Sequence, residues 1–491
     1  NDQQKAVIAA YKSLNNDLLK MTGNDAATAK KKMEAAFSIE NQIAKVSYDQ
    51  VKSRDPQANY HPMTWEQLLK NYPGVDWNYL LKAAGYPNNG GKVDVGQPEP
   101  VHEVEKILAT APLDALKAYM ELAVITSSAG MLSDNFSDRN FEYTKVAYGV
   151  QEQQPRWKRA LSFVQGIMGE AVGKLYVQKY FPESSKHRMI TLVKNLQDAF
   201  AQRIEENTWM TAATKQKALE KLQAFDIKIG YPDKWQNMDS VFVIDDNKSL
   251  IDNVKTVQEA AMKYRIAKRW GKPVDKKEWH MTPQTVNAYY DPTTNSINFP
   301  AAILQPPFFD PTVDDAANYG AIGAVIGHEM SHGFDDQGCQ FDKDGNMKNW
   351  WTEEDKKNYD ARTKVLVDWF NKQEVIPGLN VNGEKTLGEN IGDNGGLNIA
   401  FRALENSMKA KPLGDMDGFT PAQRFFLAWG RVWASNVAPQ FVAYIVNSDV
   451  HSPSISRVNA ALPMIDNWYK AFDIKEGDKL FVPQQNRAHI W

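Results

Sequence analysis

Two histidines one helical turn apart constrain the fold of this chain more than any other feature of its sequence. His328 and His332 enclose Glu329 in the pattern H-E-x-x-H, directly after the apolar run of residues 321–326. On a helix, positions i and i+4 lie on one face, so both imidazoles can reach a single cation while Glu329 reaches a water beside it. A solvated polar helix face is the alternative reading, but the apolar approach favours a buried metal site.

A second pair of side chains offers a further ligand. A catalytic zinc needs three protein ligands and one open position. Glu389 and Asp393 again stand at i and i+4, so one carboxylate can bind the metal while the other orients a ligand imidazole. Two solvated carboxylates are the alternative. The Gly-rich, apolar flanks of the pair do not decide between these readings, and from the residues alone both stay open.

Composition limits the classes of protein to which the chain can belong. Its 491 residues exceed the roughly 250–300 at which a single core stops growing, so two or more packed units are expected. Lys and Arg total 57 against 60 Asp and Glu, a net charge of -3, which argues against a nucleic-acid partner. The sequence holds no run of about 18 apolar residues for a transmembrane segment. Its single cysteine, Cys339, excludes an intramolecular disulfide.

The spacing of apolar residues changes along the chain. Roughly the first 235 residues carry apolar side chains at helical spacing, with a Pro- and Gly-rich break at 87–100. The later part mixes short strands with helices. The pattern predicts strands at 241–244, 285–290 and 296–299, and helices at about 319–334 and 352–372.

Several motifs in this later part resemble one known family. They are HEMSHGFDD from His328, GENIGDNGG from Gly388, NAYY from Asn287, FPAAILQPPFF from Phe299 and DVHSP from Asp449. Together and in this order they are similar to the neprilysin and endothelin-converting-enzyme family of zinc metalloendopeptidases, in a bacterial form. The resemblance is dense from about residue 288 to the end of the sequence and thinner before it.

The resemblance implies a role for each residue of the metal site. His328, His332 and Glu389 would bind one Zn2+ per chain, with Asp393 beside them as the partner of a ligand. Glu329 would be the general base that assists attack of a zinc-bound water on the peptide carbonyl. His451, which by itself is an ordinary surface histidine, would donate to the developing oxyanion.

The resemblance also implies the substrate contacts. Arg457 would grip a substrate carbonyl, and Asn287 with Ala288 would anchor the peptide by β-augmentation. By themselves these residues read as a surface charge and a strand. Core-type residues would form the pocket for the hydrophobic residue after the cut: Ile303, Phe308, Val325, Val432 and Trp433. The expected substrates are oligopeptides, cut on the amino side of a hydrophobic residue.

The expected fold is mainly α with a small β component. A thermolysin-like zinc peptidase domain is expected at 240–491, and a mainly helical domain at 1–239 is expected to cover it and enclose a central cavity. This boundary is approximate, since the first domain can contribute to the catalytic half. Family members begin upstream of Asn1, so either a segment was cleaved off, which would make that segment a candidate partner, or the sequence is a fragment. The resemblance favours the periplasm or cell surface of a bacterium, with the cytoplasm as the alternative.

Two rival functions remain, and only the second shares this metal chemistry. The first is a peptide-binding protein that keeps the peptidase fold without turnover, against which the intact Glu329 argues. The second is a zinc hydrolase of another amide, such as a cell-wall peptide. A different metal pattern begins at Asp342, where acidic residues approach the spacing of a calcium loop. Met347 stands where that loop needs glycine, so an ordinary polar turn is expected.

Overall fold

The structure is a computed structural model that describes residues 2–491, and it divides into two compact units. Unit 1 comprises the residues up to Arg156 together with 236–274 and 438–441, and unit 2 comprises 157–235, 275–437 and 442–491. Helices dominate both units, which confirms the mainly α class with a small β component. No helix of the described part is long and apolar enough to cross a bilayer.

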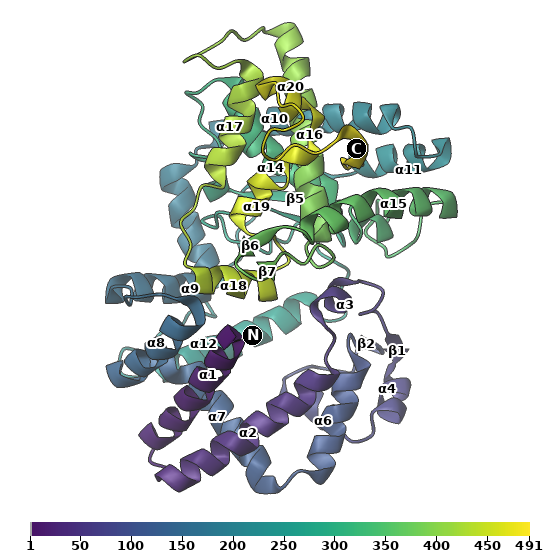
Figure 1. Ribbon diagram of the computed structural model, residues 1–491. Helices are drawn as coiled ribbons and strands as arrows, with labels where there is room; N and C mark the ends of the chain where they lie inside the picture. The colour runs from purple at the N-terminus through teal and green to yellow at the C-terminus, as the bar shows by residue number, and fades with distance from the viewer. Residues whose placement is uncertain (1) are drawn as a thin grey trace. The chain divides into compact units, whose positions relative to one another are not determined.

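Unit 1 is built from amphipathic helices around a small apolar core (Figure 1). Leu14 and Leu18 on α1 stand one turn apart and pack with Ala29 and Met33 of α2. The side chain of Asp25 caps α2 by accepting from two backbone N–H groups. The elements are α1 (Asp2–Met21), α2 (Ala26–Val46), α3 (Gln50–Arg54), β1 (Pro62–Thr64), α4 (Trp65–Asn71), α5 (Trp77–Ala83), β2 (Lys92–Asp94), α6 (Pro98–Thr110), α7 (Leu113–Ser128), α8 (Asp134–Tyr148) and α12 (Leu250–Arg269).

Unit 2 holds the H-E-x-x-H motif and a larger apolar core. Its elements are α9 (Arg156–Tyr180), α10 (Glu183–Glu206), α11 (Ala212–Gln223), β3 (Asp226–Gly230), β4 (Tyr289–Asp291), β5 (Ser296–Pro300), α13 (Asp315–Asn318), α14 (Ala324–His332), α15 (Glu353–Phe370), β6 (Glu374–Ile376), β7 (Leu379–Asn380), α16 (Leu387–Ala410), α17 (Pro421–Val432), α18 (Pro439–Ser448, of which the part from Val442 belongs here), α19 (Ser454–Asn459) and α20 (Asp466–Phe472).

The centre of unit 2 is the packing of α14 along α16, with α10 against both helices (Figure 1). A three-stranded sheet in the order β3-β5-β4 lies beside α14, with β3 parallel and β4 antiparallel to β5. All five residues of β5 are buried, as expected for the central strand of a covered sheet. Helix α14 is therefore held on several sides by packed elements.

Most local predictions agree with the structure, and one is wrong. The predicted strand at 296–299 corresponds to β5, and the predicted helix at 352–372 corresponds to α15. Of the strand predicted at 285–290, only residues 289 and 290 are in a strand, β4. The helix predicted at 319–334 begins with a π-helical turn, Tyr319–Gly323, which leads into α14. Residues 241–244 form no strand: Val241 is buried, but Val243 and Ile244 are exposed and the segment pairs with no strand of the described chain.

The two units of the structure are not separated by one boundary between residues 239 and 240, as the expected domains were. Residues 157–235, expected in the first domain, pack in unit 2, where α10 contacts both α14 and α16. Residues 240–274, expected in the second domain, belong to unit 1 with α12. Local spacing assigned these segments to helices, but which unit a helix joins depends on contacts with residues far along the chain.

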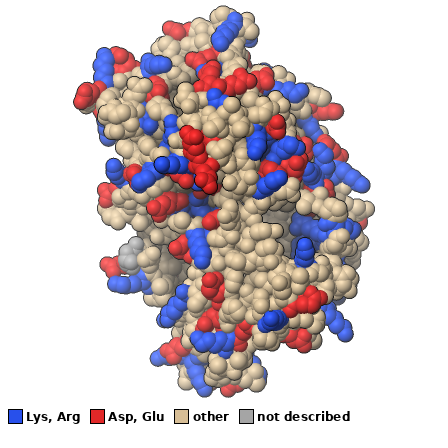
Figure 2. Space-filling model, turned by 90° about the vertical axis from the view of Figure 1, so that its right-hand side faces the viewer, with Lys and Arg blue, Asp and Glu red and all other residues tan. Residues whose placement is uncertain are grey.

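On the face drawn in Figure 2, acidic and basic side chains are interspersed.

Candidate metal centre

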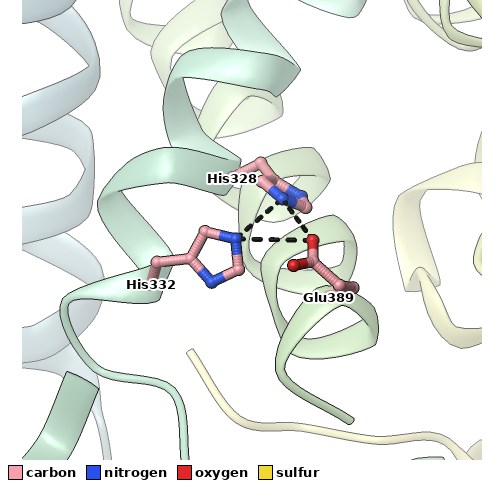
Figure 3. Close-up of side chains that lie close together, drawn as sticks. All are labelled: His328, His332 and Glu389. Carbon is pink, nitrogen blue, oxygen red and sulfur yellow. Dashed lines mark hydrogen bonds and ion pairs between the residues drawn. The ribbon is translucent and has the colours of Figure 1, made fainter. Parts of the chain in front are cut away.

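Three side chains from two helices converge on one point in unit 2 (Figure 3). Helix α14 supplies His328 and His332, and the first turn of α16 supplies Glu389. The Nε2 atoms of the two histidines are 2.9 Å apart. The Glu389 Oε2 atom lies 3.1 Å from the Nε2 of His328 and 3.5 Å from that of His332. The structure thus brings together the three residues that the sequence singled out as ligands.

Carboxylates fix the orientation of both imidazoles. The Nδ1 of His328 lies 2.9 Å from Asp393 Oδ1, and the Nδ1 of His332 lies 2.7 Å from Asp335 Oδ2. A carboxylate accepts, so each Nδ1 donates its proton and each Nε2 presents a lone pair to the common point. Asp393 was predicted for such a role. Asp335 was not, although it stands three residues after His332, where the helix has just ended.

The geometry fits a zinc ion. Two imidazole nitrogens and one carboxylate oxygen are the donor set of a catalytic zinc site that keeps a fourth position open. With ligand bonds of about 2.0–2.1 Å, the ligand atoms of a tetrahedral site are about 3.3 Å apart. The observed separations of 2.9, 3.1 and 3.5 Å bracket that value. Three lone-pair donors at these distances would repel one another without a cation between them.

Glycines allow the two ligand-bearing helices to approach so closely. A Cβ on Gly327 of α14 would lie 2.9 Å from the Cα of Gly396 on α16, and a Cβ on Gly396 would lie 2.4 Å from the Ala324 carbonyl oxygen. A Cβ on Gly392 would lie 2.7 Å from the ring of His328. The Gly-rich flanks of Glu389 are therefore packing positions that let the second helix deliver its carboxylate.

The electrostatics of the cluster favour positive charge at its centre. Burial and the neighbouring His332 lower the pKa of His328, but its hydrogen bonds to Asp393 and Glu389 outweigh them and raise the pKa above its usual value. Burial likewise opposes the charge on Glu389, yet the adjacent His332 and His451 hold its pKa well below the usual range. Either protons or a cation can supply the positive charge that these carboxylates stabilise.

Glu329 is a buried carboxylate next to the ligands. Only 5% of its surface is exposed, and burial raises its pKa although His328 and His332 counteract this effect. A raised pKa makes a carboxylate a stronger base, which suits a group that takes a proton and returns it.

His451 faces the metal ligands from a loop before α19. Its Nε2 lies 3.1 Å from Glu389 Oε2, and its Nδ1 lies 2.8 Å from Asp449 Oδ1. Burial lowers the pKa of His451, but Glu389 and Asp449 outweigh it and raise the pKa to about 9. The raised pKa favours the protonated imidazole, whose Nε2–H faces Glu389. Asp449 also accepts from the backbone N–H of His451, which fixes the loop.

Arg457 is a buried partner of Asp393 as well as a site residue. Its Nε and Nη2 donate to the two carboxylate oxygens of Asp393 at 2.9 and 2.6 Å. Its guanidinium also stacks over Trp433, 3.8 Å from the ring centroid. The prediction from composition, a surface charge, is therefore wrong. Arg457 holds the carboxylate that orients His328, and no local pattern in the sequence indicates this role.

The predicted substrate residues occupy two settings in unit 2. Asn287 is exposed, and its Oδ1 accepts from the N–H of the buried Ala288, just before the edge strand β4. The five residues of the predicted apolar pocket belong to, or pack against, one hydrophobic cluster: Ile303, Phe308, Val325, Val432 and Trp433. The segment that resembles a calcium loop is a polar turn, because Asp342 Oδ1 accepts from the backbone N–H groups of Asp344 and Asn346.

Comparison with known proteins places this site in a family. Two models of peptidase family M13 match the chain, the N-terminal one over residues 1–232 and the second over 287–488. The chain is 34% identical to a neutral endopeptidase of Lactobacillus helveticus over 476 residues, 97% of this chain and 71% of that protein. It is 32% identical to human neprilysin over 493 residues, 94% of this chain and 64% of that protein.

A solved structure agrees in fold over the whole chain. The crystal structure of the Mycobacterium tuberculosis zinc metalloprotease Zmp1 in complex with an inhibitor matches with a TM-score of 0.96 and 40% identity, covering 100% of this chain and 75% of that one. These matches confirm the family resemblance found in the motifs. His328, His332 and Glu389 fit an HExxH-type metal site, and the chain belongs to peptidase family M13, a family of zinc metalloendopeptidases.

Proposed function

We propose that this chain holds one zinc ion on His328, His332 and Glu389 and hydrolyses peptide bonds of oligopeptides. One observation carries the proposal: three lone-pair ligands converge at 2.9–3.5 Å beside a buried carboxylate, Glu329, and His451 faces them with its Nε2 3.1 Å from Glu389 Oε2. A site that only bound peptides would not need a buried base next to its metal.

Each residue around the metal has a separate role in hydrolysis. Bound zinc supplies Lewis acidity, which polarises a carbonyl and makes water more acidic. Glu329 takes a proton from the attacking water and delivers it to the leaving amine. The Nε2–H of His451 donates to the oxygen on which negative charge develops, and Asp449 keeps that donor in place. Asp393 keeps the lone pair of His328 aimed at the metal.

Residues flanking the metal would position the peptide. Two donors of Arg457 are taken by Asp393, which leaves other N–H groups of its five for a substrate carbonyl. Asn287 and Ala288 lead into β4, an edge strand of the sheet, where an extended peptide can add by backbone pairing. The apolar residues of the predicted pocket, from Ile303 to Trp433, would take a hydrophobic side chain and so direct cutting to its amino side.

Digestion of a mixed oligopeptide library tests the proposal, with cut sites read by mass spectrometry and metal content by elemental analysis. The zinc-loaded protein is expected to cut before hydrophobic residues. Glu329→Gln is expected to keep zinc and lose at least about 100-fold in turnover, because it removes the base and no ligand. Glu353→Gln, an exposed carboxylate at the start of α15, is the matched control and should cut like the wild type.

Each rival function has its own outcome in this experiment. Peptide binding without cleavage by the zinc-loaded protein would replace the peptidase with a binding protein. Cleavage of a cell-wall peptide with no cutting of the library would favour the other amide hydrolase. Near-normal turnover of Glu329→Gln with zinc bound would refute the role given to that residue. Cut sites without preference for a following hydrophobic residue would refute the apolar pocket.

A further inference from the structure

A buried lysine outside the metal centre holds the loop that follows the metal-binding helix. Residues 333–341 leave α14 directly after His332 and carry Asp335. Lys221 reaches this loop from α11, and it is only 1% exposed. None of the steps assigned above uses Lys221, so its burial needs a separate explanation.

The ammonium of Lys221 binds three backbone carbonyl oxygens of the loop. It donates to the carbonyl oxygens of Gly333 at 2.6 Å, Gly338 at 2.7 Å and Phe341 at 2.7 Å. An ammonium has three N–H groups, so these contacts use all of its donors. The three carbonyls belong to the first residue, an inner residue and the last residue of the loop, so one side chain contacts the segment at three separate points.

Asp335 and Lys221 hold the same residue of the loop. One carboxylate oxygen of Asp335 accepts from the Nδ1 of His332, and the other accepts from the backbone N–H groups of Gln337 and Gly338 at 2.9 and 2.6 Å. Gly338 thus gives its N–H to Asp335 and its carbonyl to Lys221. Any shift of Gly338 changes where the Asp335 carboxylate can stand.

The loop lies directly against the end of the metal-binding helix. A Cβ on Gly338 would be 1.8 Å from the backbone oxygen of His332. No side chain fits there, so the loop has no room to approach further. Its attachment to Lys221 helps to keep it from moving outward, and Tyr359 and Trp350 also donate to carbonyls of the loop. The close packing makes the position of Asp335 sensitive to the loss of that attachment.

We propose that Lys221 is a positioning residue for the metal centre. By fixing residues 333–341 it keeps Asp335 on the Nδ1–H of His332, and Asp335 keeps the lone pair on Nε2 aimed at the metal. Partners of this outer kind commonly set metal affinity by about 10–100-fold. The inference depends on the metal-binding role of His332 and not on peptide hydrolysis, so its test measures metal retention.

The test is the rate at which the zinc-loaded full-length chain loses metal to an excess of a coloured chelator. Lys221→Met keeps the length of the side chain and removes its donors, and it is expected to release zinc about 10–100-fold faster. Lys217→Met, an exposed lysine one turn earlier on the same helix, is the matched control and should release zinc like the wild type. Equal rates for Lys221→Met and the wild type would overturn the proposal.

A double-mutant cycle separates positioning from general destabilisation. If Lys221 acts through Asp335, Lys221→Met should have no further effect on zinc release in an Asp335→Asn background. Full additivity would overturn the proposal. Leu222→Ala, which removes a fully buried neighbour on α11, should lower the melting temperature without the same loss of zinc. Equal zinc loss in that variant would mean that Lys221 acts only through stability.

A steric variant keeps the proposal testable if Lys221→Met does not fold. Gly338→Ala removes no charge and no donor, but its methyl group must push the loop away from His332. It is expected to release zinc faster in the same way as Lys221→Met. Wild-type metal retention in folded Gly338→Ala would show that the loop position does not control the metal, and would overturn the proposal.

Discussion

Individual side chains of this metal centre depend on partners that are far away in the sequence. Asp393 stands 65 positions from His328 and accepts a hydrogen bond from its Nδ1. Arg457 in turn donates to both carboxylate oxygens of Asp393. A free carboxylate in that place would rotate and lose the imidazole. The chain of contacts from Arg457 to His328 therefore stabilises one tautomer, and with it the lone pair that a metal requires.

Lys221 should make the stability of the fold depend on pH. Burial lowers the pKa of its ammonium from 10.5 to about 7. Between these values the unfolded chain binds a proton, while the folded chain holds a neutral amine with two N–H groups for the three carbonyls. This group therefore makes the free energy of unfolding rise as the pH rises from about 7 to 10.5. The rise is about 1.4 kcal/mol per pH unit at most, and it is lost on acidification.

The measurement compares urea unfolding of metal-free wild type and Lys221→Met at pH 7 and pH 9. The free energy of unfolding of the wild type is expected to increase relative to that of the variant at the higher pH. The difference between the two proteins removes the contribution of titrating groups that Lys221 does not affect. Parallel pH dependences would contradict a lowered pKa for Lys221.

At the scale of elements, two helices carry the metal ligands and their contact decides the geometry. Helices α14 and α16 meet through Gly327 and Gly396, where neither backbone leaves room for a methyl group. Glycine inside a helix costs about 1 kcal/mol relative to alanine, so its presence at the contact has to be offset by packing. In this protein, the close contact at Gly327 and Gly396 brings Glu389 within reach of both imidazoles.

Gly396→Ala should separate these helices. Its Cβ would lie 2.4 Å from the Ala324 carbonyl oxygen, so overpacking is expected to cost about 1–3 kcal/mol of unfolding free energy and to reduce bound zinc. Gly430→Ala on α17 is the matched control, since a Cβ there meets no atom within 4 Å. That change should leave stability equal or raise it by up to about 1 kcal/mol. Urea unfolding and metal analysis of both variants check the prediction, and equal effects would contradict it.

At the scale of the whole molecule, the chain builds each unit from separate stretches of sequence. Unit 2 joins residues 157–235, 275–437 and 442–491, and its metal ligands come from helices that are about 60 positions apart. A ligand that binds only the folded state stabilises it by mass action. All three ligands lie within residues 275–437, so bound zinc should stabilise the folded state of unit 2 by joining α14 to α16.

Removing the metal should lower the melting temperature. At a free zinc concentration of about 1,000 times the dissociation constant, the expected stabilisation is about 4 kcal/mol. Calorimetry with chelator, and again after zinc is returned, measures the shift. Glu389→Ala lacks one of the three ligands, and its melting temperature should respond little to either treatment. A wild-type melting temperature that is the same with and without zinc would contradict the assigned metal site.

Local periodicity made much of this site predictable from the sequence. The spacing of His328 and His332 requires only one helical turn, and a helix fixes that geometry whatever surrounds it. The motif around Glu389 supplied a third ligand through family resemblance, and the structure brings that residue to the pair. The prediction of a strand at 241–244 was wrong because a run of residues with high β propensity still needs a partner strand. No local pattern shows whether that partner exists.

The sequence by itself determined the ligand pair, the buried base beside it and the mainly helical character of the chain, because these depend on neighbours within one or two helical turns. Only the tertiary structure decided that Asp335 orients His332, that Lys221 fixes the loop carrying Asp335, and that residues 157–235 pack with the metal-binding helix. These features depend on contacts between residues far apart along the chain, and such contacts exist only once the whole core has packed.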